Sequence, residues 1–156
     1  MYSHIMVPLD GSELAECVFG HVIDIATCNK SKVTLTRVVP PLVMATAEYA
    51  GMISPAQFQK IEDSDIAAAT KYLAEKQAFF KEKGFDVETE VMFGNVVDSL
   101  ASFVEAHGVD LIIIATHGRS GVSRWVMGSV AERILRSSKV PVLIVRPTHC
   151  VLPKMV

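Results

Sequence analysis

The chain has 156 residues, half of them hydrophobic, and its 15 basic and 17 acidic residues give a formal net charge of −2 at pH 7. This length suits one domain over residues 1–156 and leaves room for a substantial core. The charge balance argues against nucleic acid as the main partner, which would favour a basic face. No apolar run approaches the ~20 residues that cross a bilayer, and no signal-peptide pattern opens the chain, so we expect no membrane insertion.

The three cysteines are Cys17, Cys28 and Cys150. They have neither the close spacing nor the number that a zinc site or a disulfide framework requires. From them we expect a reduced protein in the cytoplasm.

Residues 1–9 are mostly apolar and predict a short strand that ends at Pro8. The following Asp10-Gly11-Ser12 predicts a turn, with Ser12 as the N-cap of a helix. The helix has an apolar face at Ala15, Val18, Val22 and Ile25. An aspartate before glycine is commonly a turn former. Asp10 also lies at the carboxyl end of the first strand, where open α/β sheets bind ligands, and we favour that second role.

Residues 32–39 (KVTLTRVV) are rich in β-branched side chains and predict the second strand. Residues 42–63 have no clear periodicity. They suit either a variable connection over the sheet, which is the commoner case, or a partner surface. A long helix is then expected from Ser64 or Asp65 to about Lys83, ended by Gly84. Its buried face would consist of Ile66, Ala69, Leu73 and Phe80.

Residues 86–93 alternate apolar and polar side chains, as in a half-exposed edge strand. Gly94-Asn95 precedes a helix that ends at Gly108, and residues 111–115 suit a strand buried on both faces. A last helix and a strand over Val140 to Val145 complete the chain. The inward-facing residues predicted on these two helices are Val97, Leu100, Ala101 and Val104 on the first, and Ala131, Ile134 and Leu135 on the second. Alternating strands and helices indicate an open, largely parallel α/β sheet with helices on both faces.

Residues 110–129 (DLIIIATHGRSGVSRWVMGS) run from a buried strand through a glycine-containing loop to a helix start at Gly128-Ser129. This arrangement can hold a phosphate, because glycine lets the backbone come close and the helix N-terminus presents free N–H groups. The loop is neither a Walker loop nor a dinucleotide fingerprint. Arg119 and Arg124 suit either phosphate binding or a solvated surface, and Trp125 suits either packing under the loop or exposure.

Here the chain resembles the ATP-binding branch of the universal stress protein family. That branch carries Gly, two residues, Gly, nine residues and then Gly-Ser or Gly-Thr. This chain has Ala115 in place of the first glycine, then Gly118, nine residues, and Gly128-Ser129. The resemblance extends to MVPLDGSELAE near the start and VPVLIVRP near the end. It implies a Rossmann-like sheet of order 3-2-1-4-5, whose first and fourth strands end together at the ligand crevice.

The resemblance implies a nucleotide-dependent regulatory or stress-response protein that binds ATP, with magnesium brought by the triphosphate, and that hydrolyses it slowly at most. In the family an aspartate matching Asp10 contacts the adenosine, and a backbone group matching Val38 meets the adenine. His117 lies inside the motif and suits either a loop position beside the phosphates, which we favour, or a solvent-exposed turn, and we assign it no catalytic role. The implied nucleotide-binding residues are Pro8, Leu9, Asp10, Ser12, Val38, Ile114, Ala115, Thr116, His117, Gly118, Arg119, Gly128, Ser129 and Val130.

Two other functions agree less well with the sequence. A protein-interaction module of the same fold with an empty pocket is disfavoured by the retained glycines, Gly118 and Gly128. An adenylyl-transferring ligase would carry SGG-x-DS or HIGH, and neither occurs. The resemblance also implies a homodimer through the last strand, Val140 to Val145, whose exposed edge would recruit its own copy. A further protein partner is left unidentified.

Overall fold

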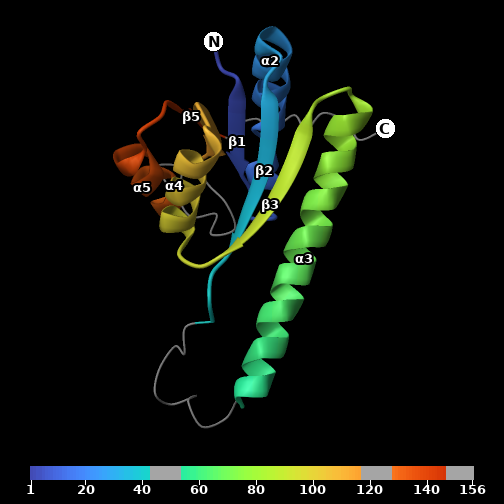
Figure 1. The fold of residues 1–156 in the computed structure, drawn as a ribbon, viewed down its shortest axis with the longest axis vertical. Coiled ribbons are helices and arrows are strands. Elements are labelled where there is room, and N and C mark those ends of the chain that lie inside the picture. The colour runs from blue at the N-terminus through green and yellow to red at the C-terminus, as the bar shows by residue number, and fades with distance from the viewer. Residues whose placement is uncertain (43–53, 117–127, 147–156) are drawn as a thin grey trace.

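The computed structural model describes residues 1–42, 54–116 and 128–146. Five parallel strands form one sheet in the order β3-β2-β1-β4-β5, with β1 at the centre (Figure 1). The strands are β1 (His4–Pro8), β2 (Lys32–Val39), β3 (Val87–Phe93), β4 (Leu111–Ala115) and β5 (Val142–Val145). The predicted fold class and strand order are confirmed. The last strand begins two residues later than the sequence predicts.

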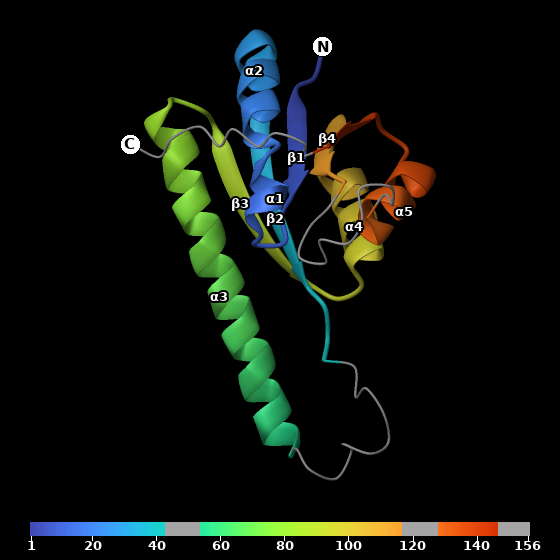
Figure 2. The same cartoon turned by 180° about the vertical axis from the view of Figure 1, so that it is seen from behind.

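Helices cover both faces of the sheet (Figures 1 and 2). One face carries α1 (Glu13–Glu16), α2 (Phe19–Asn29) and α3 (Pro55–Glu82), and the other carries α4 (Val96–His107) and α5 (Ser129–Ser137). Each face has its own core. The first is built around Val7, Val22, Leu35, Leu73 and Phe80, and the second around Met6, Leu100, Ile112, Ala131 and Ile134. The sheet therefore separates two apolar layers, as its central strands, buried on both sides, require.

The single helix predicted after Ser12 is wrong, because the structure divides it into α1 and α2. The backbone N–H of Cys17 donates to the carbonyl of Leu14 at 3.3 Å, an i→i−3 bond that tightens the last turn of α1. A regular ladder resumes with the bond from Val22 N to Val18 O at 3.0 Å. Val18 and Val22 are buried as predicted, whereas Ile25 is half-buried.

The start predicted for the long helix is also wrong. Helix α3 begins at Pro55, about ten residues earlier, so residues 55–63 are helical and not an irregular connection. Ser54 and Gln57 form a capping box: Ser54 Oγ accepts from Gln57 N at 3.3 Å, and Gln57 Oε1 accepts from Ser54 N at 2.8 Å. Proline is favoured at the first helical position because its missing N–H would have no partner there. The rest of the segment, residues 43–53, lies outside the described residues.

The first half of α3 extends past the carboxyl ends of the strands (Figure 1). None of its residues before Ala69 is buried, whereas Ala69, Leu73, Phe79 and Phe80 are. Ile66, predicted to be buried, is half-exposed. Only the second half of α3 therefore packs fully on the sheet.

The helices of the other face follow the predicted pattern with two corrections. Asn95 caps α4 by accepting from Val97 N and Asp98 N, and Gly108 ends it in a left-handed conformation, φ 63°. Ala101, predicted to face inward, is exposed, and Phe103 is buried instead. Leu135 on α5 is 47% exposed, also against expectation. Among the described residues no helix combines the length and apolar character of a membrane span.

Candidate functional site

The site lies where the winding of the sheet reverses, between the carboxyl ends of β1 and β4. These strands are paired directly, with Ile5 opposite Leu111 and Met6 opposite Ile112. Beyond the ends of the strands, Leu9 N donates to Thr36 O at 2.8 Å and Thr116 N donates to Val145 O at 2.9 Å. Both bonds hold the chain in register where it leaves the sheet. Ligands of open α/β folds bind at this kind of position.

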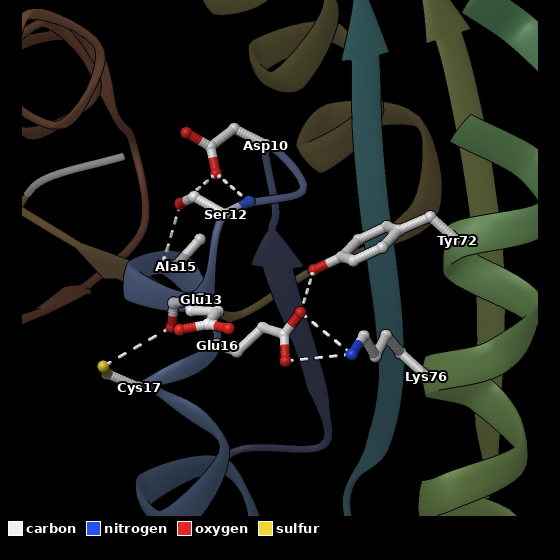
Figure 3. A network of polar contacts seen from close by, with 8 residues as sticks. All are labelled: Asp10, Ser12, Glu13, Ala15, Glu16, Cys17, Tyr72 and Lys76. Carbon is white, nitrogen blue, oxygen red and sulfur yellow. Dashed lines mark hydrogen bonds and ion pairs between the residues drawn. The ribbon is translucent and has the colours of Figure 1, made fainter. Parts of the chain in front are cut away.

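The turn after β1 is fixed by the side chain of Asp10 (Figure 3). Its Oδ1 accepts hydrogen bonds from Ser12 N at 3.0 Å and Ser12 Oγ at 2.6 Å, and Ser12 Oγ accepts from Ala15 N at 3.2 Å. Ser12 therefore caps α1, as predicted, and its hydroxyl is engaged within the turn. The carboxylate of Asp10 is held beside the end of β1.

The backbone conformation of Gly11 favours glycine. Its φ of 85° lies in the left-handed region, where side chains are strained. A Cβ atom there would lie 2.9 Å from Nη1 of Arg37, so the flexible end of the arginine side chain would have to move. This close approach places a positive charge against the outer side of the Asp10 turn.

Behind the turn, a buried polar network joins α1 to α3 (Figure 3). The carboxylate of Glu16 accepts from Tyr72 Oη at 2.9 Å and from Lys76 Nζ at 2.9 Å. Burial first, and then the Glu16 carboxylate, raise the pKa of Tyr72 far above its ordinary value, although Arg37 opposes the shift. The hydroxyl thus stays protonated and donates to Glu16. The guanidinium of Arg37 lies 5.2 Å from the Tyr72 ring centroid. Because it also lies next to Gly11, it links this polar network to the turn after β1.

On the opposite side of the site, α5 begins with an N-terminus that no described side chain caps. Gly128, its N-cap residue, donates its N–H to Thr116 O at 2.7 Å, which ties the helix start to the end of β4. The N–H groups of the first turn have no partner within the helix and carry the positive end of its dipole. This is suitable geometry for a negatively charged group.

These elements surround a cavity of about 260 Å³. Pockets for drug-sized ligands are roughly 300–1,000 Å³, so its volume is close to the lower end of that range. Its walls come from both strand ends, from β2, and from α1, α4 and α5. The lining residues are Pro8, Leu9, Asp10, Ala15, Thr36, Val38, Val96, Leu100, Ile114, Ala115, Thr116, Gly128, Ser129, Val130 and Ala131.

Ten of the fourteen residues predicted for the site line this cavity: Pro8, Leu9, Asp10, Val38, Ile114, Ala115, Thr116, Gly128, Ser129 and Val130. Ser12 does not, because its place is in the turn behind Asp10. His117, Gly118 and Arg119 lie outside the described residues, as do Arg124 and Trp125. The structure thus brings together sequence segments that are more than one hundred residues apart.

Sequence reasoning missed five lining residues: Ala15, Thr36, Val96, Leu100 and Ala131. Thr36 could have been found, because residues two apart in a strand share a face and Val38 was already selected. Leu100 and Ala131 were identified only as core residues. Nothing in helical periodicity distinguishes a residue that packs on the sheet from one that borders a cavity.

Of the three cysteines, Cys28 is a free, exposed thiol. Cys150 lies outside the described residues, so the expected reduced state of the chain stays a prediction.

The model of the universal stress protein family matches residues 1–146. A putative universal stress protein of Staphylococcus saprophyticus, SSP1056, is 34% identical over 152 residues, covering 93% of this chain and 84% of the relative. The solved structure of protein MJ0577, a universal stress protein of Methanocaldococcus jannaschii, superposes with a TM-score of 0.79 at 26% identity, covering 94% and 96% of the two chains. The universal stress protein of Archaeoglobus fulgidus shares the fold at a TM-score of 0.62 and 19% identity, over 92% and 97%.

Proposed function

The chain belongs to the universal stress protein family, and on this premise we propose that its cavity binds an adenine nucleotide, with ATP as the ligand. Binding of the nucleotide would regulate the part that the protein plays in the stress response. Hydrolysis would be slow at most, and we assign no residue to its catalysis.

One observation carries this proposal: a cavity at the reversal of strand order has the Asp10 carboxylate on one side and, on the other, the N-terminus of α5, which no side chain of the described residues caps. A carboxylate is a hydrogen-bond acceptor for sugar hydroxyls, and a helix N-terminus attracts phosphate. The apolar side chains between them, including Val38 and Ile114, would pack against the base. A nucleotide contains these three chemical parts in one molecule.

Ligands of related proteins support the choice of an adenine nucleotide. Universal stress protein structures have been solved in complex with dAMP, for the Archaeoglobus fulgidus protein, with AMP, for an Arabidopsis thaliana protein, and with cAMP. These three relatives are 16–23% identical to this chain, so their ligands suggest the class of ligand. We extend the proposal from an adenine nucleotide to ATP because Gly128-Ser129 matches the end of the ATP-binding motif.

Magnesium would accompany the triphosphate. Among residues 1–42, 54–116 and 128–146, no three His, Cys, Asp or Glu side chains are grouped to hold a metal ion. Mg²⁺ commonly binds through one or two carboxylates together with the phosphates of a nucleotide. Asp10 is the carboxylate on the cavity wall, and the phosphate oxygens would supply most of the coordination.

Thermal unfolding with and without ATP-magnesium, together with calorimetry, tests the proposal. A ligand at about 100 times its dissociation constant adds about 2.7 kcal/mol of stability. We expect a raised unfolding temperature and measurable heat of binding. If millimolar ATP-magnesium changes neither, the nucleotide proposal fails. A protein-interaction module of the same fold then becomes the better hypothesis.

We further propose that two copies associate through β5. This strand lies at the edge of the sheet, and among the described strands it pairs only with β4. Val142, Leu143 and Ile144 are each half-buried in the single chain. An apolar strand edge with unpaired backbone groups tends to recruit another strand, and a two-fold axis would let each copy satisfy the other.

A further inference from the structure

The hydroxyl of Thr36 is buried, and none of the described residues forms a hydrogen bond with it. Thr36 lies in β2 and is 0% exposed, and its Oγ1 has no hydrogen-bond partner among the described residues. Most buried polar side-chain atoms in proteins have a partner, and leaving one without costs about 1–3 kcal/mol. An exception of this kind in a well-packed sheet requires an explanation.

Thr34 is on the same strand as Thr36 but does not line the cavity, so it serves as a comparison. It lies two residues earlier, so its side chain is on the same face of β2. It is 2% exposed, and its Oγ1 is 2.7 Å from Nε2 of His4. The fold therefore supplies a partner for the hydroxyl of Thr34. The side chain of Thr36 instead borders the cavity of the candidate site.

The part of the cavity wall around Thr36 is buried and largely apolar. Leu100, Ile114 and Ala131 line it and are 2%, 6% and 2% exposed. Asp10 and Gly128 are half-exposed and Ser129 is exposed, so these residues form the rim. The cavity thus has a polar rim and a mostly apolar inner wall that also includes two buried threonines, Thr36 and Thr116.

This distribution indicates which part of a nucleotide would reach Thr36. A phosphate is charged, and burying it against apolar side chains would cost far more than one hydroxyl returns. A base has two apolar faces and a polar edge of hydrogen-bond donors and acceptors. A threonine hydroxyl donates one hydrogen bond and accepts others, so it can pair with either kind of group on that edge.

We propose that Thr36 Oγ1 forms a hydrogen bond with the base of the bound nucleotide, which makes Thr36 a specificity-determining residue of the site. This rests on the proposed function, because it needs a nucleotide in the cavity. The proposal goes further than the proposed function, because it identifies a side chain that recognises the base through a hydrogen bond. Ligands without a hydrogen-bonding group at that position would leave the hydroxyl unpaired and bind more weakly.

Thr36→Val tests the proposal, because valine keeps the shape of threonine and removes only the hydroxyl. We expect the dissociation constant of ATP to rise about tenfold, the typical effect of one lost hydrogen bond. AMP and 2′-deoxy-ATP should lose the same factor, because they share the base and differ in phosphates or sugar. Without nucleotide, the variant should unfold at the same temperature as the wild type or higher.

Two further variants serve as controls. Thr36→Ser keeps the hydroxyl and should bind ATP nearly as the wild type does. Thr34→Val removes the neighbouring hydroxyl, which has a partner in His4, and should lower the unfolding temperature while leaving the affinity for ATP unchanged. The opposite pattern of the two valine variants distinguishes a ligand-binding hydroxyl from a structural one.

The proposal is overturned if the wild type binds ATP and Thr36→Val binds it equally well, and the proposed function then stands without it. It is also overturned if Thr36→Val unfolds at a lower temperature, as Thr34→Val should, or fails to fold, because Oγ1 would then have a structural partner. If the wild type binds no nucleotide, both the proposed function and this inference fail.

Discussion

Lys76 on α3 and Glu16 on α1 form an ion pair at 2.9 Å, and both side chains are about nine-tenths buried. The pair connects the long helix to the short one that begins directly after the Asp10 turn (Figure 3). Removing one partner of a buried pair leaves an uncompensated charge in a poorly solvating environment, which is why such losses are large.

Lys76→Met should therefore lower the free energy of unfolding by about 3–5 kcal/mol, as measured by urea denaturation. Lys139→Met is the matched control, because Lys139 pairs with Glu105 at 2.6 Å but both side chains are exposed. An exposed pair contributes little to stability, so Lys139→Met should change the free energy of unfolding far less than Lys76→Met does. Equal losses in the two variants would show that burial of the Glu16–Lys76 pair has no special effect.

Gly128→Val should abolish ATP binding and leave the fold intact. The backbone of Gly128, at φ −57° and ψ 139°, is in a region that valine adopts readily, so the change introduces no backbone strain. Its side chain would stand where phosphate has to approach the start of α5. Calorimetry measures the binding and circular dichroism the fold. Normal binding by the variant would place the phosphate elsewhere.

Gly20→Ala is the control for replacing a glycine away from the cavity. Gly20 is exposed in α2, and a Cβ atom there meets nothing within 4 Å. The variant should bind ATP as the wild type does and gain about 0.5–1 kcal/mol of stability, because alanine favours the helix.

Ala115→Gly should keep or improve the affinity for ATP and reduce stability. Ala115 ends β4, lines the cavity, and occupies the place of the first glycine in the family motif. Its methyl group is buried, so its loss together with the flexibility of glycine should cost about 1–2 kcal/mol. Calorimetry and denaturation report the two effects separately. A large loss of affinity would instead make this methyl group part of the binding surface.

Asp110→Asn should destabilise the protein at neutral pH and cease to do so in acid. Asp110 Oδ2 accepts from Ser3 N at 2.8 Å and Ser3 Oγ at 2.6 Å, and Oδ1 accepts from His4 N at 3.0 Å. Burial alone would raise the pKa of this carboxyl, but the hydrogen bonds outweigh it and the net pKa lies below its ordinary value. The stability that the carboxylate contributes is thus present above the pKa of the unfolded chain.

This contribution is lost as the pH falls from about 4 through the lower pKa of the folded state. We expect the variant to be less stable at pH 7, by at most about 1 kcal/mol because solvent screens this largely exposed carboxylate, and the difference to shrink below about pH 4. Denaturation of both proteins at several pH values measures this. A difference that is the same in acid and at neutrality would contradict the role given to the charge.

Dimerisation through β5 predicts a mass near twice the 17.0 kDa chain in light scattering at micromolar concentration. Val142→Lys should give a folded monomer, because a charged side chain on the edge strand opposes pairing. A monomeric wild type would rule out the interface. So would a folded variant that keeps the dimer mass.

Elements with strong periodicity could be predicted from the sequence almost to the residue. The limits of β2 and β4 are as expected, since β-branched and apolar runs bounded by turn residues leave few alternatives. Helix α3 was placed too late because residues 42–63 have no clear periodicity, although Pro55 at the first helical position favours the helix. Leu135 is exposed because helical spacing cannot fix how α5 is rotated against the sheet.

The site was predictable to the extent that the ends of β1 and β4 define it. Two segments chosen separately, near Asp10 and near Gly128, line one cavity because the strand order places them together. The spacing of Thr36 to Val38 could have placed it on the cavity wall. The sequence does not show that its hydroxyl has no partner among the described residues, because this depends on its surroundings in the fold.

The extension of α3 beyond the strands has a consequence for how the protein unfolds. Residues of α3 from Ala69 onward are anchored by buried side chains, so their amide protons should exchange with solvent only when the whole domain opens. The turns between Pro55 and Ala69 have no buried side chain and depend on the capping box of Ser54 and Gln57. They should open locally and exchange much faster, so that one continuous helix behaves as two units of very different stability.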